Sequence, residues 1–133
     1  MGTSEKGDLG VSEVIATASR KGYSILFPLS GHKQYDLVLE KNGNFKRIQV
    51  KYEKGNGEYI RAKAYYNSGK GNKTKKYTNS DIDALLIFDE NTKKCYYISS
   101  DKLINGRSSF YLRIKKPKNN QTKNINWARD FEW

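Results

Sequence analysis

The chain has 133 residues, and its 25 Lys and Arg against 14 Asp and Glu give a formal net charge of +11 at pH 7. A chain of this length predicts one domain, residues 1–133, and leaves no room for a second catalytic domain. The positive charge favours a polyanion such as nucleic acid as the partner, and no apolar run approaches the ~20 residues of a spanning helix, so we expect no membrane partner.

The first predicted element is a helix over residues 4–21, which Gly22 is expected to end. Its apolar residues are spaced to form one stripe: Val11, Val14, Ile15 and Ala18. Residues 23–27 follow as a strand that ends at Pro28. The residues before the helix lack the apolar stretch of a secretory signal, so we expect an intracellular protein of the cytoplasm or nucleoid rather than a secreted one.

A β-hairpin is predicted next, with strands at residues 35–40 and 48–51. Asn42-Gly43 between two apolar alternating runs is a strong turn signal, because both residues tolerate the positive φ of a type I′ turn. Side chains alternate along a strand, so Gln49 and Lys51 share one face and the apolar residues beside them point to the other.

This hairpin carries the groups that phosphodiester hydrolysis requires. Asp36 supplies a charged metal ligand, and the side-chain oxygen of Gln49 and the backbone carbonyl of Val50 complete an oxygen site of the kind Mg²⁺ prefers, with Mn²⁺ as a substitute. Lys51 is the candidate for orienting the attacking water and countering charge on the phosphate. The simpler alternative is an ordinary cross-strand ion pair between Asp36 and Lys51. A nucleophilic triad or a His/Cys zinc site lacks its partners, because Cys and His each occur once.

The rest of the chain alternates between predicted strands and polar segments. Residues 58–66 predict a half-buried strand with a basic, aromatic open face, and residues 67–76 are expected to form a mobile cationic loop. The remaining expected elements are a hairpin of strands at 84–88 and 95–98 with Cys95 packed in the core, a capped short helix at 100–103, a strand at 110–114, a polar loop at 116–123, and a helical face shared by Trp127 and Phe131.

The expected nucleic-acid-binding residues lie on the strand at 58–66 and in the loop after it: Tyr59, Arg61, Lys63, Tyr65, Lys73, Lys75 and Lys76. The cations are expected to contact phosphates, and the tyrosines to pack against sugars or unpaired bases. The alternatives are a solvated surface loop for the lysines and shielding of the sheet for the tyrosines.

Five segments share a pattern with a known group of enzymes: Lys6–Gly10, Lys21–Tyr23, Pro28–Ser30, Tyr35–Val38 and Ile48–Lys51. A helix, a strand, an Asp-bearing strand and then Gln-Val-Lys resemble the PD-(D/E)XK nuclease superfamily, and more narrowly its branch that includes group I intron-encoded homing endonucleases. The resemblance covers the first half of the chain closely and the rest loosely. It implies an α/β domain with a mixed central β-sheet flanked by helices, and a metal-dependent endonuclease.

The chain departs from the superfamily pattern at two positions. Gln49 stands where Asp or Glu is usual, which keeps an oxygen ligand but removes one negative charge; the intron-encoded branch is similar in using Gln there. Many relatives carry a Glu on the first helix, where this chain has Val11. Glu13 lies about 200° around the helix from Val11, so we expect Asp8, one turn before Val11, to be the substitute.

The resemblance implies a site-specific, Mg²⁺-dependent endodeoxyribonuclease that acts on double-stranded or branched DNA. A homodimer is the minimum assembly that presents one site to each antiparallel strand, and the intron-encoded relatives make a homotetramer a second option. A Holliday-junction resolvase is the alternative enzyme, because such enzymes use the same compact core with a basic face. A catalytically inactive DNA-binding module, in which Gln49 marks a lost metal site, is the non-enzyme alternative.

Overall fold

The computed structural model describes residues 1–69, 71–104 and 108–133, so Lys70 of the predicted cationic loop lies outside the described residues. A mixed five-stranded sheet runs in the order β1-β2-β3-β7-β8, and only its β3–β7 pair is parallel. Its strands are β1 (Ser24–Leu26), β2 (Leu37–Lys41), β3 (Asn44–Glu53), β7 (Ala84–Asp89) and β8 (Lys94–Ser99).

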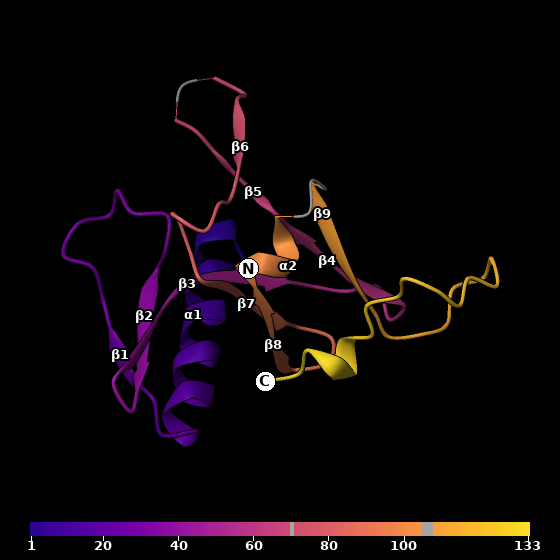
Figure 1. Ribbon diagram of the computed structural model, residues 1–133, viewed down its shortest axis with the longest axis horizontal. Helices are drawn as coiled ribbons and strands as arrows, with labels where there is room; N and C mark the ends of the chain where they lie inside the picture. The colour runs from indigo at the N-terminus through magenta and orange to yellow at the C-terminus, as the bar shows by residue number, and fades with distance from the viewer. Residues whose placement is uncertain (70, 105–107) are drawn as a thin grey trace.

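Two smaller sheets and three helical segments complete the described fold (Figure 1). β4 (Tyr59–Lys63) pairs with β9 (Ser109–Arg113), and β5 (Tyr65–Asn67) pairs with β6 (Thr74–Lys76) as a hairpin that projects from the body. The helical segments are α1 (Thr3–Arg20), α2 (Ser100–Leu103) and the 3-10 turn η1 (Ala128–Asp130).

The predicted first helix and its end are confirmed. Val14 and Ala18 of α1 are fully buried against the main sheet. After Lys21 the chain turns at Gly22, whose φ is +85°, a conformation that costs glycine little. The Tyr23 N–H donates to the Ala18 carbonyl at 3.0 Å and the Gly22 N–H to the Ser19 carbonyl at 3.1 Å, which satisfies the last helical acceptors.

Two apolar cores lie on opposite faces of the main sheet, because alternate residues of its strands point to opposite sides. Ile48, Val50 and Leu86 face α1. Leu85 and Ile87 face the small β4–β9 sheet. α1 therefore covers one face of the main sheet, and the β4–β9 sheet covers the other. The site described below lies on the second face, where β3 approaches β4.

The predicted hairpin turn is also confirmed. Asn42 and Gly43 have φ values of 54° and 80°, as a type I′ turn requires. The turn pairs Lys41 with Asn44 and carries the register on to Leu37 and Ile48. One pair of turn residues thus decides which residue of β3 lies beside the start of β2.

The predictions for residues 58–76 are partly wrong. A continuous strand was expected at 58–66, but the chain divides at Ala64, whose N–H donates to the Ser108 carbonyl at 3.0 Å. β4 before the division pairs with β9, and β5 after it pairs with β6. Thr74–Lys76 is therefore a strand and not part of an irregular loop, because β5 supplies a hydrogen-bonding partner that composition alone does not reveal.

The later elements follow the predictions with two differences. α2 occupies the expected residues but has no side-chain hydrogen bond at its N-cap, Ser99. The helix expected around Trp127 and Phe131 is only the short turn η1. Phe131 is half-buried and still packs against the core, with its ring centroid 5.5 Å from that of Phe110. Its carbonyl accepts the Tyr97 N–H at 2.8 Å, so the C-terminal segment covers the edge of β8. Among the described residues, no helix has both the length and the apolarity needed to cross a membrane.

Candidate active site

Asp36 lies directly before β2, at the point where β3 extends beyond its neighbour. The Asp36 N–H donates to the Ile48 carbonyl at 2.8 Å. Two residues further along β3, the Val50 N–H donates to Asp36 Oδ2 at 2.9 Å. Because β2 begins only at Leu37, a side-chain carboxylate takes the place of the next strand residue as acceptor. The start of β2 thus positions the Asp36 carboxylate against β3.

Gln49 and Lys51 lie on the face of β3 that turns away from α1. Ile48 and Val50 between them are buried against α1, and both Gln49 and Lys51 are half-buried. The register that pairs Leu37 with Ile48 continues to place Asp36 opposite Gln49. The structure therefore brings three of the predicted catalytic residues to one place.

Partial burial acts on both charged groups of the site. Asp36 as a whole residue is exposed, but its carboxyl is drawn against β3. Burial raises the pKa of that carboxyl above its ordinary value, and the Val50 N–H and the charge of Lys51 lower it in part. Burial lowers the pKa of Lys51, whereas Asp36 and Glu53 act to raise it. Each charge therefore favours the charged form of the other group.

Asp36 and Lys51 nevertheless do not form the simple ion pair that was the alternative interpretation. The ion pairs among the described residues all lie elsewhere. Lys51 Nζ lies over the Tyr77 ring, 5.5 Å from its centroid. Its ammonium group is thus held near the Asp36 carboxylate without a direct ion pair. Both groups therefore remain available to bind a metal ion, a water or a substrate.

The donor atoms at this place fit a hard divalent cation. Asp36 Oδ1 and the Gln49 side chain form no hydrogen bond or ion pair with any described residue. The N–H and C=O of one strand residue point to the same side, so the Val50 carbonyl also faces the edge beside Asp36. Within the described ranges no three His, Cys, Asp or Glu side chains come together as a metal cage, and Mg²⁺ commonly binds through one or two carboxylates while keeping several waters.

Asp8 is the predicted site residue that the structure leaves apart. It is exposed on α1, and its carboxylate has no hydrogen bond or ion pair in the part of the chain that the structure describes. Its backbone carbonyl accepts the Ser12 hydroxyl at 2.9 Å. The role of Asp8 as a substitute for a helix-borne Glu stays a prediction.

Two residues of the site were missed in the sequence analysis. Glu53 lies two residues beyond Lys51 on the same face of β3; burial raises its pKa, and Lys63, Lys51 and Arg61 lower it in part. The period-two pattern that selected Gln49 and Lys51 already predicted its position. Tyr77 is buried under Lys51, and burial, with Asp36 as a further cause, raises the pKa of its hydroxyl. Nothing in the local sequence distinguishes Tyr77 from the other tyrosines.

The predicted basic surface begins beside this site. Arg61 and Lys63 are exposed on β4, and their charges act on Glu53, that of Lys63 also on Lys51. The Arg61 Nε donates to Ser109 Oγ at 3.0 Å. Tyr59 and Tyr65 are half-buried, and the exposed lysines of the β5–β6 hairpin are Lys73, Lys75 and Lys76. The positive charge thus runs from the site along β4 and onto the projecting hairpin.

Comparison with known proteins supports the resemblance seen in the sequence. Residues 1–133 match the family described as PD-(D/E)XK endonuclease. Among solved structures, the chain is similar to the bacterial homing endonuclease I-Ssp6803I, with a TM-score of 0.76 and 18% sequence identity over 99% of this chain and 89% of that chain. At this identity the likeness concerns the fold alone, and it confirms the predicted α/β fold with a mixed central sheet. No curated protein matches the chain.

Proposed function

The chain belongs to the PD-(D/E)XK endonuclease family, and from that premise we propose that it hydrolyses phosphodiester bonds of double-stranded DNA at a preferred sequence with the help of Mg²⁺. The family membership makes the chain a phosphodiester hydrolase with DNA as its substrate. The observation that carries the finer proposal is that Asp36, Val50 and Lys51 come together at the start of β2, beside the basic strand β4.

The proposal gives each residue of the site a part. Asp36, Gln49 and the Val50 carbonyl would hold the cation, which when bound polarises the phosphate and lowers the pKa of a water. Lys51 orients the attacking water and offsets the charge that develops on the phosphate. Asp8 is kept as a candidate for the helix-borne acid, and Mn²⁺ as a substitute for Mg²⁺. The nuclease domain in this proposal spans residues 1–133.

The basic residues would hold the DNA across this site. Arg61, Lys63, Lys73, Lys75 and Lys76 are assigned to phosphates, and Tyr59 and Tyr65 to sugars or bases. Their support is position, because β4 displays its cations next to Lys51 and Glu53. We further propose that two or four copies assemble, since one site per chain cuts one strand. Sedimentation that shows a monomer both free and bound to DNA would contradict this assembly.

A cleavage assay tests the proposal and separates it from its alternatives. Linear duplex, supercoiled plasmid and a four-way junction are each incubated with Mg²⁺ or with EDTA. We expect Mg²⁺-dependent cutting of duplex and plasmid at one preferred sequence. Symmetric nicking of the junction without sequence preference would instead identify a resolvase. Tight binding without cutting in any metal would identify a DNA-binding module.

A further inference from the structure

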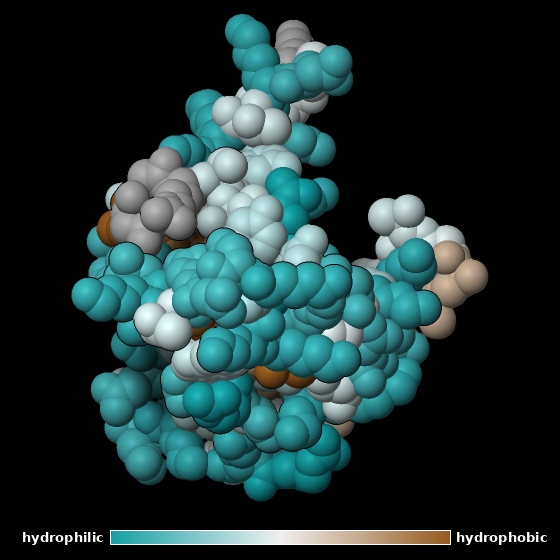
Figure 2. All heavy atoms as spheres, turned by 90° about the vertical axis from the view of Figure 1, so that its right-hand side faces the viewer, coloured by the Kyte–Doolittle hydropathy of each residue, from teal (hydrophilic) through white to brown (hydrophobic). Residues whose placement is uncertain are grey.

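A polar groove of about 780 Å³ lies on the outer face of the β4–β9 sheet, away from the catalytic residues. One wall is formed by Tyr59 of β4 and by Tyr111 and Arg113 of β9, and the other by the loop at 117–127. The Arg113 N–H donates to the Asn126 carbonyl at 2.7 Å, which holds this loop along β9. Figure 2 views the molecule from the side on which this loop lies, and hydrophilic residues cover most of that face.

The Arg113 side chain is held in place but its end is unpaired. Its guanidinium carbon lies 5.4 Å from the centroid of the Tyr59 ring, and its Nε donates to the Lys115 carbonyl at 3.2 Å. Tyr59 is held in turn by an edge contact with Tyr111, with ring centroids 5.4 Å apart. Neither Nη1 nor Nη2 has a hydrogen-bond partner among the described residues. Two parallel donors are therefore fixed in the groove without a partner.

The other wall supplies amide groups. Asn119, Gln121, Asn124 and Asn126 all line the groove. The side chains of Asn124 and Asn126 form no hydrogen bond within the described part of the chain. Carboxamides that both donate and accept, together with a fixed guanidinium, are the groups that recognise base edges in the DNA major groove. The DNA major groove is also wide enough to admit a two-stranded antiparallel ribbon such as β4–β9.

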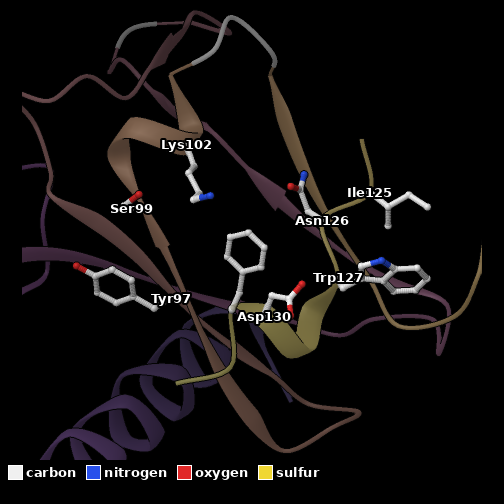
Figure 3. Close-up of a pocket in the computed structure, with 8 residues that line it drawn as sticks. Tyr97, Ser99, Lys102, Ile125, Asn126, Trp127 and Asp130 are labelled. Atoms are coloured by element: carbon white, nitrogen blue, oxygen red, sulfur yellow. The ribbon is translucent and has the colours of Figure 1, made fainter. Parts of the chain in front are cut away.

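The groove is continuous with the basic surface that starts at the active site. Tyr59 pairs with Arg113 and Arg61 with Tyr111, so the groove and the phosphate-contacting residues share one face. A second cavity of about 440 Å³ (Figure 3) shares Ile125, Asn126 and Trp127 with the groove. Lys102 is opposed there by Asp130, so the lining of that cavity has no excess of positive charge. The charge therefore favours the first groove for DNA.

We propose that this groove is a base-reading surface, in which Arg113 contacts a guanine edge in the DNA major groove and the amides of residues 119–126 contact neighbouring bases. The proposal rests on the proposed function, because it takes duplex DNA as the substrate. It adds the part of the chain that reads sequence, at a distance from the part that cuts.

Selection of bound duplexes from a randomised pool, in EDTA so that no strand is cut, tests the proposal. Wild type is compared with Arg113→Lys and Arg113→Ala, and Arg20→Lys and Arg20→Ala serve as matched controls. Arg20 is an exposed arginine on α1, which covers the opposite face of the main sheet. Lysine keeps the charge of Arg113 but not its fork of two donors. Circular dichroism checks that each variant is folded.

We expect wild type to enrich a motif with a guanine at one position. Arg113→Lys should lose the preference at that base pair alone, by about 5- to 100-fold, with affinity for random duplex within about twofold of wild type. Three results would overturn the proposal: a wild type that enriches no motif, an unchanged motif in both Arg113 variants, or a uniform loss of affinity in Arg113→Ala that Arg113→Lys restores, which would identify a phosphate contact. If wild type enriches the motif but cuts no DNA when Mg²⁺ is added, the proposed hydrolysis fails and the base-reading surface stands.

Discussion

Asp36 and Lys51 shift each other's pKa by electrostatic attraction at a distance, without forming a direct ion pair. Burial raises the pKa of Asp36 and lowers the pKa of Lys51, so it favours the neutral form of each group. The opposite charge of the other residue offsets part of each shift. The Val50 N–H adds a hydrogen bond that favours the charged carboxylate. Removal of any one of the three groups should therefore alter the other two.

Asp36→Asn and Lys51→Ala are each expected to abolish cleavage, with a loss of at least about 100-fold. Binding of DNA should stay within a few-fold of wild type, because metal binding and water activation are separate from contacts to the backbone. Plasmid cleavage with Mg²⁺ and a gel-shift assay with EDTA measure the two properties. Asp101→Asn and Lys102→Ala on α2 are matched controls, and near wild-type cutting by either site variant would remove the assigned site.

Gln49 offers a graded test of the metal site. Gln49→Glu should be tolerated, or should lower the Mg²⁺ concentration for half-maximal cleavage, because it restores a charged oxygen ligand. Gln49→Ala should be severely impaired, since it removes the oxygen. A titration of cleavage rate against Mg²⁺ distinguishes the variants, and full activity of Gln49→Ala would refute the ligand role.

At the scale of elements, β3 carries the site at one end and is anchored at the other. Arg47 near its start donates to both carboxylate oxygens of Asp83, at 3.0 Å through Nη2 and at 3.1 Å through Nε. The Arg47 backbone N–H donates to the same carboxylate at 2.7 Å. Asp83 directly precedes β7, so these contacts set the parallel register of β3 and β7, in which Ile48 pairs with Ala84.

Asp83→Asn should lower the free energy of unfolding by about 2 kcal/mol at pH 7, since it replaces a charge-assisted fork by a weaker amide contact. The hydrogen bond from Arg47 holds the pKa of Asp83 below its ordinary value. The folded carboxyl thus binds its proton at a lower pH than the unfolded one. The stabilisation is complete above the ordinary pKa near ~4 and is lost as the pH falls through the folded pKa.

Urea denaturation at pH 7 and at about pH 3 measures this effect. The difference between wild type and Asp83→Asn should shrink at the lower pH, because the carboxyl of the unfolded chain binds a proton there and the stabilisation from the lowered folded pKa falls. Asp130→Asn, at an exposed carboxylate of η1, is the matched control. Equal differences at both pH values would show that the charge of Asp83 contributes nothing to stability.

At the scale of the whole molecule, the net charge of +11 includes one continuous basic surface. It extends from Arg61 and Lys63 on β4, whose charges act on Glu53 of the site, to the exposed lysines of the projecting β5–β6 hairpin (Figure 1). The turn between β7 and β8 carries ion pairs instead, for example Lys93 with Glu90 at 2.7 Å and Lys94 with Glu132 at 3.2 Å. A polyanion should therefore bind on the side formed by β4 and the β5–β6 hairpin.

Replacing Arg61 and Lys63 together with Ala should weaken DNA binding and flatten its dependence on salt. Each phosphate contact releases counterions, so the slope of log affinity against log salt should fall by about 0.9 per contact, or about 1.8 for two. Lys93→Ala with Lys94→Ala removes the same charge from the turn between β7 and β8, where both lysines are already paired with carboxylates, and should leave the slope nearly unchanged. An unaltered slope in the Arg61 and Lys63 variant, with a normal circular dichroism spectrum, would place the DNA on another face.

Several features of this protein were predictable from the sequence because their causes are local. Helix α1 follows from an apolar period of 3.6 residues and a glycine at its end. The β2–β3 turn follows from Asn42-Gly43, since few other pairs tolerate its backbone. The alternation along β3 then places Gln49 and Lys51 on one face and predicts which residues meet Asp36.

Other features were decided only by contacts between distant segments. The break at Ala64 arises because β4 pairs with β9 and β5 with β6, and no periodicity in residues 58–66 encodes a change of partner. Tyr77 enters the site because its N–H donates to the Ala64 carbonyl at 3.0 Å. The Val50 N–H reaches the Asp36 side chain only because β2 begins at Leu37, one residue after Asp36. Local sequence specifies which residues share a face, whereas the partner across that face depends on the register that the folded chain adopts as a whole.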